Sequence, residues 1–207
     1  MIWFILGILA VALIVVVVLI IRQRKKEKPA EAIEPLVDLR VNDAQVGDSI
    51  SIGGAGEDYE DLDFDVDRKH HYESGGDESF ELSGIYRGRR LFLEVSEDDQ
   101  TSVVLNTGKT KPELHDLGLS EDDLTRMDEN QDRAEFCEYD GSRWNFQESG
   151  EVHIFQEAGS PGETFYGWEF REEGGARVLS VQKWEGEPFE VSMGQVINPD
   201  EVHVFRS

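Results

Sequence analysis

An apolar run near the start of the chain limits what this segment can form. The run, Ile2 to Ile21, has no charged side chain and no Asn, Gln or Pro. Because a helix rises about 1.5 Å per residue, a run of this length spans the roughly 30 Å hydrocarbon core of a bilayer. A signal peptide would have a basic region before a shorter run and a small-residue cleavage site, and neither is present. We predict a transmembrane helix over residues 1–21.

Basic residues follow the apolar run and set its expected orientation. They are Arg22, Arg24, Lys25, Lys26 and Lys28, with Glu27 as the one acid among residues 22–28. Basic flanks stay on the cytoplasmic side, so we predict a single-pass protein of the cell (inner) membrane with its N-terminus outside and its C-terminal domain cytoplasmic. The same residues are expected to contact anionic lipid headgroups, each contributing about 1 kcal/mol near the surface.

The rest of the chain is strongly acidic. The whole chain holds 20 Lys+Arg and 44 Asp+Glu, a net charge of −24, and all of the acidic excess lies after residue 28. Such a charge repels nucleic-acid phosphate, so nucleic-acid binding is not expected. The one cysteine, Cys137, allows no intramolecular disulfide and no cysteine-based zinc site. Its acidic neighbours raise a thiol pKa, so we expect it to be unreactive.

Residues 22–44 form the expected juxtamembrane segment and linker, and residues 45–207 the expected β-rich domain. Pro29 and Pro35 resist helix formation in the linker. The domain shows short alternating runs separated by glycine, beginning with Val46, Ile50 and Ile52. Turns are predicted around 86–89, 140–141, 148–151 and 172–176. This pattern is typical of a mainly β barrel or sandwich-like domain.

One short helix is predicted within "LGLSEDDLTRMDENQ". Ser120 suits the N-cap, and Asp123 stands where a capping-box acid reaches back. Leu119 and Leu124 match a hydrophobic staple, and Leu124 shares a face with Met127. We expect this helix to pack on the sheet.

Internal echoes indicate two related β units. "FEL" at 80–82 and "WEF" at 168–170 each precede a turn and then "LEV" at 93–95 or "LSV" at 179–181. Separately, "EVHIF" at 151–155 resembles "EVHVF" at 201–205. The sequence has no fixed short period and no third copy of these units, so a solenoid is not indicated.

An acidic row in "DLDFDVD" is the weak candidate for metal binding, through Asp61, Asp63, Asp65 and Asp67. An EF-hand loop needs Gly at position 6 and Glu at position 12, and both possible registers fail there. The intervening residues Leu62, Phe64 and Val66 are apolar, which favours a half-buried strand. Nearby cations, Arg68 and Lys69 or Arg87, Arg89 and Arg90, are candidates to neutralise the row.

Other residue patterns point to no defined chemistry. His153 and His203 would approach each other only if the echoed strands pair, and cross-strand packing is the favoured role. Of Trp144, Trp168 and Trp184, we expect at least two in the core. No nucleophile elbow, P-loop, His-Glu-x-x-His motif or dinucleotide fingerprint occurs. No catalytic residue and no cofactor is therefore predicted.

The segments "VGDSISIGG", "SFELSG", "LFLEVSEDD", "FYGWEF" and "VLSVQKWEGEPFEV" together resemble a bacterial family, domain of unknown function 4178. The resemblance covers roughly residues 46–205. It implies a compact β-rich module, attached in some members to a membrane span, and it implies no established reaction.

Together these observations favour a membrane-anchored, non-enzymatic module that binds an unknown protein partner or organises a complex at the cytoplasmic face. The alternative is a cation- or polyamine-binding regulatory domain that uses the surface around Asp61–Asp67. A carboxylate-based hydrolase is the third and less favoured hypothesis: paired carboxylates make it conceivable, but in so acidic a chain close pairs are expected by chance and have little diagnostic value.

Overall fold

The structure is a computed structural model that describes residues 39–97, 100–156 and 162–206. The predicted transmembrane helix and basic segment lie outside these residues. No helix within the described ranges is both long and apolar enough to cross a membrane.

Strands dominate the described residues, and the prediction of a mainly β domain with one short helix is confirmed. The strands are β1 Ser49–Ile52, β2 Leu62–Ser74, β3 Asp77–Tyr86, β4 Arg89–Glu97, β5 Thr101–Asn106, β6 Phe136–Tyr139, β7 Ser142–Phe155, β8 Glu163–Glu172, β9 Arg177–Trp184, β10 Phe189–Ile197 and β11 Val202–Phe205. The α-helix is α2 Glu121–Asn130, and the other helical segments described are single 3-10 turns.

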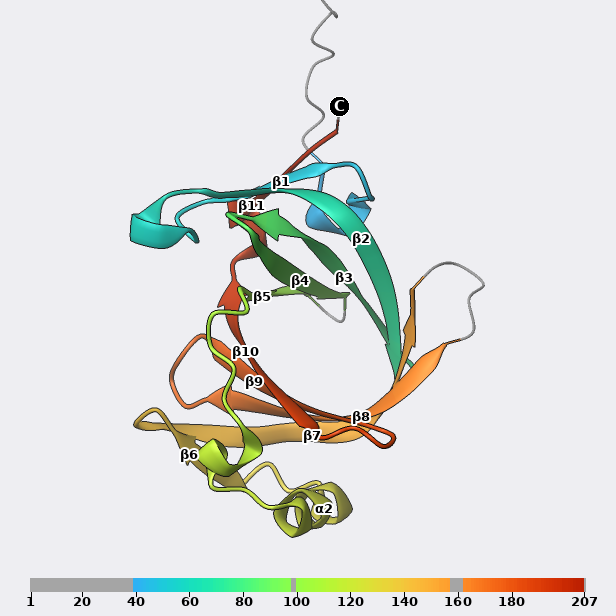
Figure 1. Ribbon diagram of the computed structural model, residues 1–207, viewed down its shortest axis with the longest axis vertical. Helices are drawn as coiled ribbons and strands as arrows, with labels where there is room; N and C mark the ends of the chain where they lie inside the picture. Colours follow the sequence, from blue (N-terminus) through green and yellow to red (C-terminus); the bar gives the residue numbers. More distant parts are fainter. Residues whose placement is uncertain (1–38, 98–99, 157–161, 207) are drawn as a thin grey trace, which may run out of the picture. The chain divides into compact units, whose positions relative to one another are not determined.

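Strand pairing closes a ring. The order along the sheet is β11-β1-β2-β3-β4-β5-β10-β9-β8-β7-β6, and β2 also pairs with β7. The second pairing joins His71 to Phe155, Tyr72 to Ile154 and Glu73 to His153. The strands β2, β3, β4, β5, β10, β9, β8 and β7 thus form a closed barrel, seen end-on in Figure 1. We call the short β2–β7 pairing the seam.

The barrel is built from two similar halves. In one half β1 pairs with the beginning of β2, and β2 to β5 follow as a meander. In the other, β6 pairs with the beginning of β7, and β7 to β10 follow in the same way. The echoed "FEL" and "WEF" lie on β3 and β8, and "LEV" and "LSV" on β4 and β9. These echoes therefore fall at corresponding places in the two halves, whereas "EVHIF" ends β7 and "EVHVF" lies largely on β11, which do not correspond.

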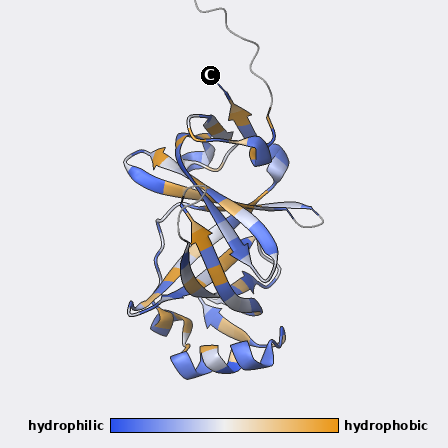
Figure 2. Cartoon of the chain, turned by 90° about the vertical axis from the view of Figure 1, so that its right-hand side faces the viewer, coloured by the Kyte–Doolittle hydropathy of each residue, from blue (hydrophilic) through white to orange (hydrophobic). Residues whose placement is uncertain are grey.

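Two hydrophobic cores lie on the outside of the ring. On one side Leu82, Leu93 and Val103 of β3, β4 and β5 pack with Ile50 of β1 and Val204 of β11. On the other, Trp168 and Phe170 of β8 pack with Leu124 and Met127 of α2. Figure 1 shows β1 and β11 above the ring and α2 below it, and Figure 2 shows hydrophobic and hydrophilic residues alternating along the strands. The inward-facing positions are therefore the opposite, more polar set.

The first half of β2 has the predicted half-buried pattern. Leu62, Phe64 and Val66 are buried, and Asp63, Asp65 and Asp67 are exposed between them. Residues 62–65 pair with β1 alone, and the pairing with β3 begins at Val66. The charges are tolerated because this face is open to water.

Most predicted turns are confirmed. Tyr86 pairs with Arg89 around Arg87-Gly88, and Tyr139 pairs with Ser142 around Asp140-Gly141. In both turns the two central residues have positive φ, as a two-residue hairpin of type I′ requires. Residues 173–176 likewise separate β8 from β9.

Two local predictions are wrong. No turn occurs at 148–151, since β7 continues from Ser142 to Phe155 and absorbs the irregularity as a register shift between Phe146 and Glu148. Pairing with β8 along its length overrides the local Glu-Ser-Gly signal. Val46 lies before β1 and is exposed, so it opens no strand. Leu39 and Val41 lie within the predicted linker but contact the domain, Leu39 through a bridge to Val204.

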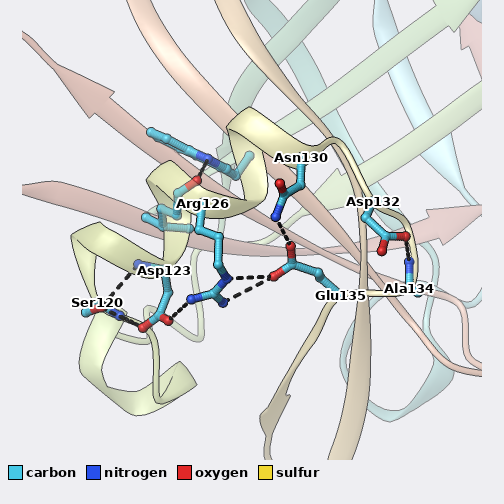
Figure 3. A network of polar contacts seen from close by, with 9 residues as sticks. Ser120, Asp123, Arg126, Asn130, Asp132, Ala134 and Glu135 are labelled. Atoms are coloured by element: carbon cyan, nitrogen blue, oxygen red, sulfur yellow. Dashed lines mark hydrogen bonds and ion pairs between the residues drawn. The ribbon is translucent and has the colours of Figure 1, made fainter.

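The helix α2 begins as predicted (Figure 3). The Ser120 hydroxyl accepts a hydrogen bond from the Asp123 backbone N–H, and the Asp123 carboxylate accepts one from the Ser120 N–H. Arg126 then contacts both Asp123 and Glu135, at 2.7 Å and 3.1 Å. The hydrogen bonds from Ser120 and Arg126 lower the pKa of the Asp123 carboxyl to about 2. The acidic residues in the first turn of α2 therefore stabilise the N-terminus of the helix.

Candidate binding site inside the barrel

The inner face of the barrel carries glutamates on facing strands. Glu81 of β3 lies directly opposite Glu94 of β4 in the register. Their neighbours Leu82 and Leu93 point the other way into the first core. Because side chains alternate along a strand, both glutamates point into the ring. Glu94 is exposed to solvent although it lies in the middle of β4, so water reaches the interior.

Both glutamates have a raised proton affinity. Burial and then the charge of Glu94 raise the pKa of Glu81 to about 7. Hydrogen bonding with Tyr72 and the charge of Arg90 act in the opposite direction on Glu81. Reduced solvation and the charge of Glu169 raise the pKa of Glu94 to about 7. Near neutral pH the pair therefore attracts a proton or another cation.

Glu169 belongs to the far wall. It lies on β8, which is four strands from β4 in either direction around the ring. It sits between Trp168 and Phe170, which point outward into the second core. Burial raises the pKa of Glu169, and the charge of Arg171 lowers it, the two groups being 3.6 Å apart. Glu94 and Glu169 both face inward, and the charge of Glu169 contributes to the raised pKa of Glu94.

Aromatic side chains line the same inner face near the seam. Tyr72 of β2 lies edge-on to Phe165 of β8, with ring centroids 6.4 Å apart. Phe165 stands opposite Trp184 of β9, with centroids 4.8 Å apart. Burial, together with the charges of Glu81 and Glu94, raises the pKa of the Tyr72 hydroxyl. The phenol stays protonated at every physiological pH.

The cations near this interior are mostly engaged elsewhere. Arg90 donates two hydrogen bonds to Asp67, at 2.6 Å and 2.9 Å, and one to Ser83. His70 lies 3.6 Å from Glu81, but burial and the charges of Arg68 and Arg90 lower its pKa. A neutral His70 does not balance Glu81. The inner carboxylates are therefore only partly compensated by the protein.

The predicted acidic row does not converge on one point. Asp61 accepts a hydrogen bond from the Gly54 N–H at 3.1 Å, Asp65 accepts one from the Ser49 hydroxyl at 2.6 Å, and Asp67 binds Arg90. The expected neutralisation by Arg90 is confirmed at Asp67. Asp63 remains on the exposed face with the others. Cation binding by this row stays a prediction.

The remaining candidates have structural roles. His153 is on β7 and His203 on β11, and these two strands do not pair, so the condition for the two histidines to approach each other is not met. Trp144 and Trp168 are buried, as expected for two of the three tryptophans, and Trp184 faces the interior. Cys137 is buried on β6, and burial raises the pKa of its thiol to about 11.

Sequence reasoning missed Glu81, Glu94 and Glu169. A usable signal existed in the internal echo, since each of "FEL" and "WEF" carries a glutamate between two apolar residues. The alternation that predicted the acidic row on one strand face also predicts that the glutamates of "FEL" and "WEF" face away from a core. The sequence did not indicate that the sheet closes into a ring. This closure makes the strand face opposite the cores the interior of the barrel.

Fold and site together define a closed β-barrel module with an acidic, partly aromatic inner face. The family model for a domain of unknown function, DUF4178, matches residues 46–199, and the chain belongs to this family. The comparisons found no match among curated proteins and none among solved structures.

Proposed function

We propose that the chain is a membrane-anchored, non-enzymatic binding module whose barrel interior receives a small organic cation. The observation that carries this proposal is the placement of Glu81 and Glu94 on one wall and Glu169 on the opposite wall of an inner face that water reaches. A ligand with positive charge at two points would satisfy both walls at once. The site is thus inside the ring, away from the acidic row around Asp61–Asp67.

The aromatic residues favour an organic cation over a bare inorganic ion. Faces of Tyr and Trp attract ammonium groups, and apolar rings also accept the methylene groups between them. Tyr72, Phe165 and Trp184 supply such a surface beside the carboxylates. A linear polyamine combines both features.

Binding is better supported than acid–base catalysis. General acid–base chemistry uses two groups whose pKa values are pushed apart, so that one donates and the other accepts a proton. Here the pKa values of Glu81 and Glu94 are shifted in the same direction, upward, chiefly by burial. This symmetry supports a cation site more than a hydrolase.

Membrane attachment is part of the proposal. Its support is the apolar run Ile2 to Ile21 with the basic residues of 22–28 behind it. The acidic domain would face the cytoplasm, held away from anionic lipid by its own charge. A reporter fused after Ser207 should be active in the cytoplasm, and activity on the outer side would contradict this orientation. Binding of a protein partner by the same domain stays a prediction.

Calorimetric titration of the full-length chain in a mild detergent with spermidine tests the interior site. We expect saturable binding at physiological ionic strength, weakened at least about tenfold, or about 1.4 kcal/mol, by Glu94→Gln or Glu169→Gln. Glu138→Gln removes the same charge from an exposed position on β6 and should leave the affinity unchanged.

Three results would contradict binding at the interior site. They are the absence of saturable heat, equal affinity in the interior variants and wild type, and equal loss in the Glu138→Gln control. Saturable binding of calcium without spermidine binding would also reject an organic cation.

A further inference from the structure

Three side chains on the outer surface near the seam lie close together. His71 and Glu73 are on β2, and Glu78 is on β3. Their ligand atoms all lie within 4.8 Å of one another. The register explains this, since Glu73 is directly opposite Glu78 and His71 is two residues from Glu73 on the same face.

Both carboxylates approach the same ring nitrogen. The Nε2 atom of His71 is 3.8 Å from Glu73 Oε1 and 3.8 Å from Glu78 Oε2. These distances are too long for hydrogen bonds. Two ligand atoms that each lie about 2 Å from a shared ion are separated by a slightly shorter distance. Small side-chain rotations would bring the three ligand atoms to that separation.

The other histidines that contact carboxylates lack this arrangement. Glu113 approaches Nδ1 of His115 at 3.2 Å, and Asp116 approaches Nε2 at 3.4 Å, so the two acids lie at opposite nitrogens. His153 contacts Glu151 through Nε2, while its Nδ1 is engaged with the Thr164 hydroxyl. A single ion cannot be shared by both partners in either case. Within the described part of the chain, His71 is where two carboxylates converge on one imidazole nitrogen.

Electrostatics also favours a cation between these residues. Like charges directly opposite each other on neighbouring strands destabilise the pair. The ion pairs described for Glu73 and Glu78 are both with His71, which cannot fully neutralise two carboxylates. A divalent ion would convert this repulsion into a link between β2 and β3.

We propose that His71, Glu73 and Glu78 bind a divalent transition-metal ion, with Zn²⁺ the best match. One imidazole and two carboxylates suit zinc, whereas Mg²⁺ and Ca²⁺ prefer oxygen ligands alone. Three protein ligands leave a further position for water. The site lies beside the seam, where β2 and β7 are joined by the pairs at residues 71–73. The ion would therefore hold β2 in place where the barrel closes.

Isothermal titration of the full-length chain with zinc chloride, in mild detergent and without chelators, tests this site. We expect one saturable site whose affinity falls at least about tenfold in His71→Ala. Glu78→Gln should weaken binding in the same direction. His115→Ala is the matched control, because it also removes an exposed histidine flanked by two acids, and it should bind zinc like the wild type.

Zinc should also raise the melting temperature of the wild type and of His115→Ala, but not that of His71→Ala. Near-UV circular dichroism will show that the variants are folded. The proposal is overturned by absent saturable binding, by unchanged affinity in folded His71→Ala, or by an equal loss in His115→Ala. Glu94→Gln should retain zinc binding, which separates this site from the barrel interior.

Discussion

At the scale of single residues, Gly84 shows how closely two strands approach. It lies on β3 opposite Val66, beside the bulge where β2 bends. A Cβ atom at this position would overlap the backbone oxygen of Asp65 and the ring of Phe64. The glycine is required by close packing and not by its own φ angle. The barrel wall and the first core meet at this point.

Gly84→Ala should therefore destabilise the domain. Overpacking against backbone costs about 1–3 kcal/mol, since neither β2 nor β3 is free to move. Chemical denaturation of the full-length chain will measure the change in the free energy of unfolding. Gly53→Ala is the control, because a Cβ there meets no atom within 4 Å and should change stability little. Equal stability of the two variants would contradict the close approach.

At the scale of elements, α2 depends on its first turn. The helix has ten residues, too few to be stable alone, so its caps and its packing on β8 hold it. The indole N–H of Trp168 donates a hydrogen bond to the Leu124 carbonyl at 3.0 Å. This bond and the buried pair Leu124 and Met127 attach the helix to the outer surface of the barrel.

Ser120→Ala should lower the free energy of unfolding by about 1 kcal/mol, because it removes the acceptor for the Asp123 N–H. Ser120→Asp keeps an acceptor at the same place and should restore most of the loss. Urea denaturation measures both. If alanine and aspartate behaved alike, the cap would not contribute as described.

The hairpins show which elements local sequence determines. Residues 86–89 and 139–142 turn as predicted because Gly88, Asp140 and Gly141 favour positive φ angles, whereas Arg87 adopts one within its hairpin. The segment around Gly150 has similar residues but stays extended, since it pairs with β8 throughout. Long-range pairing decides between a turn and a strand whenever the local preference is weak.

At the scale of the whole molecule, the interior carboxyls make stability depend on pH. In the folded state the pKa values of Glu81 and Glu94 are raised from 4.5 to about 7. The folded state therefore binds more protons than the unfolded state between these values, and stability falls as pH rises through this window. Asp123 and Glu172 have lowered pKa values of about 2, so their contribution is lost only at more acidic pH.

We expect Glu81→Gln to stabilise the domain at pH 8 and to change it little near pH 4.5. Glutamine resembles the protonated acid and removes the like charge opposite Glu94. Thermal melts between pH 4.5 and 8 should show a smaller decline than in the wild type. The surface variant Glu138→Gln should keep the wild-type slope, and an equally steep decline in Glu81→Gln would contradict the raised pKa.

The sequence by itself determined the local features of this protein. Alternation in 61–67, the two-residue turns and the cap at Ser120 follow from side-chain periodicity and backbone preference, which act over a few neighbours. Tertiary structure alone decided that β2 pairs with β7 and that Glu94 faces Glu169 across a ring. Alternation identifies two faces of a strand but not what covers each. Here apolar faces are covered from outside, and closure between distant strands makes the acidic faces an interior.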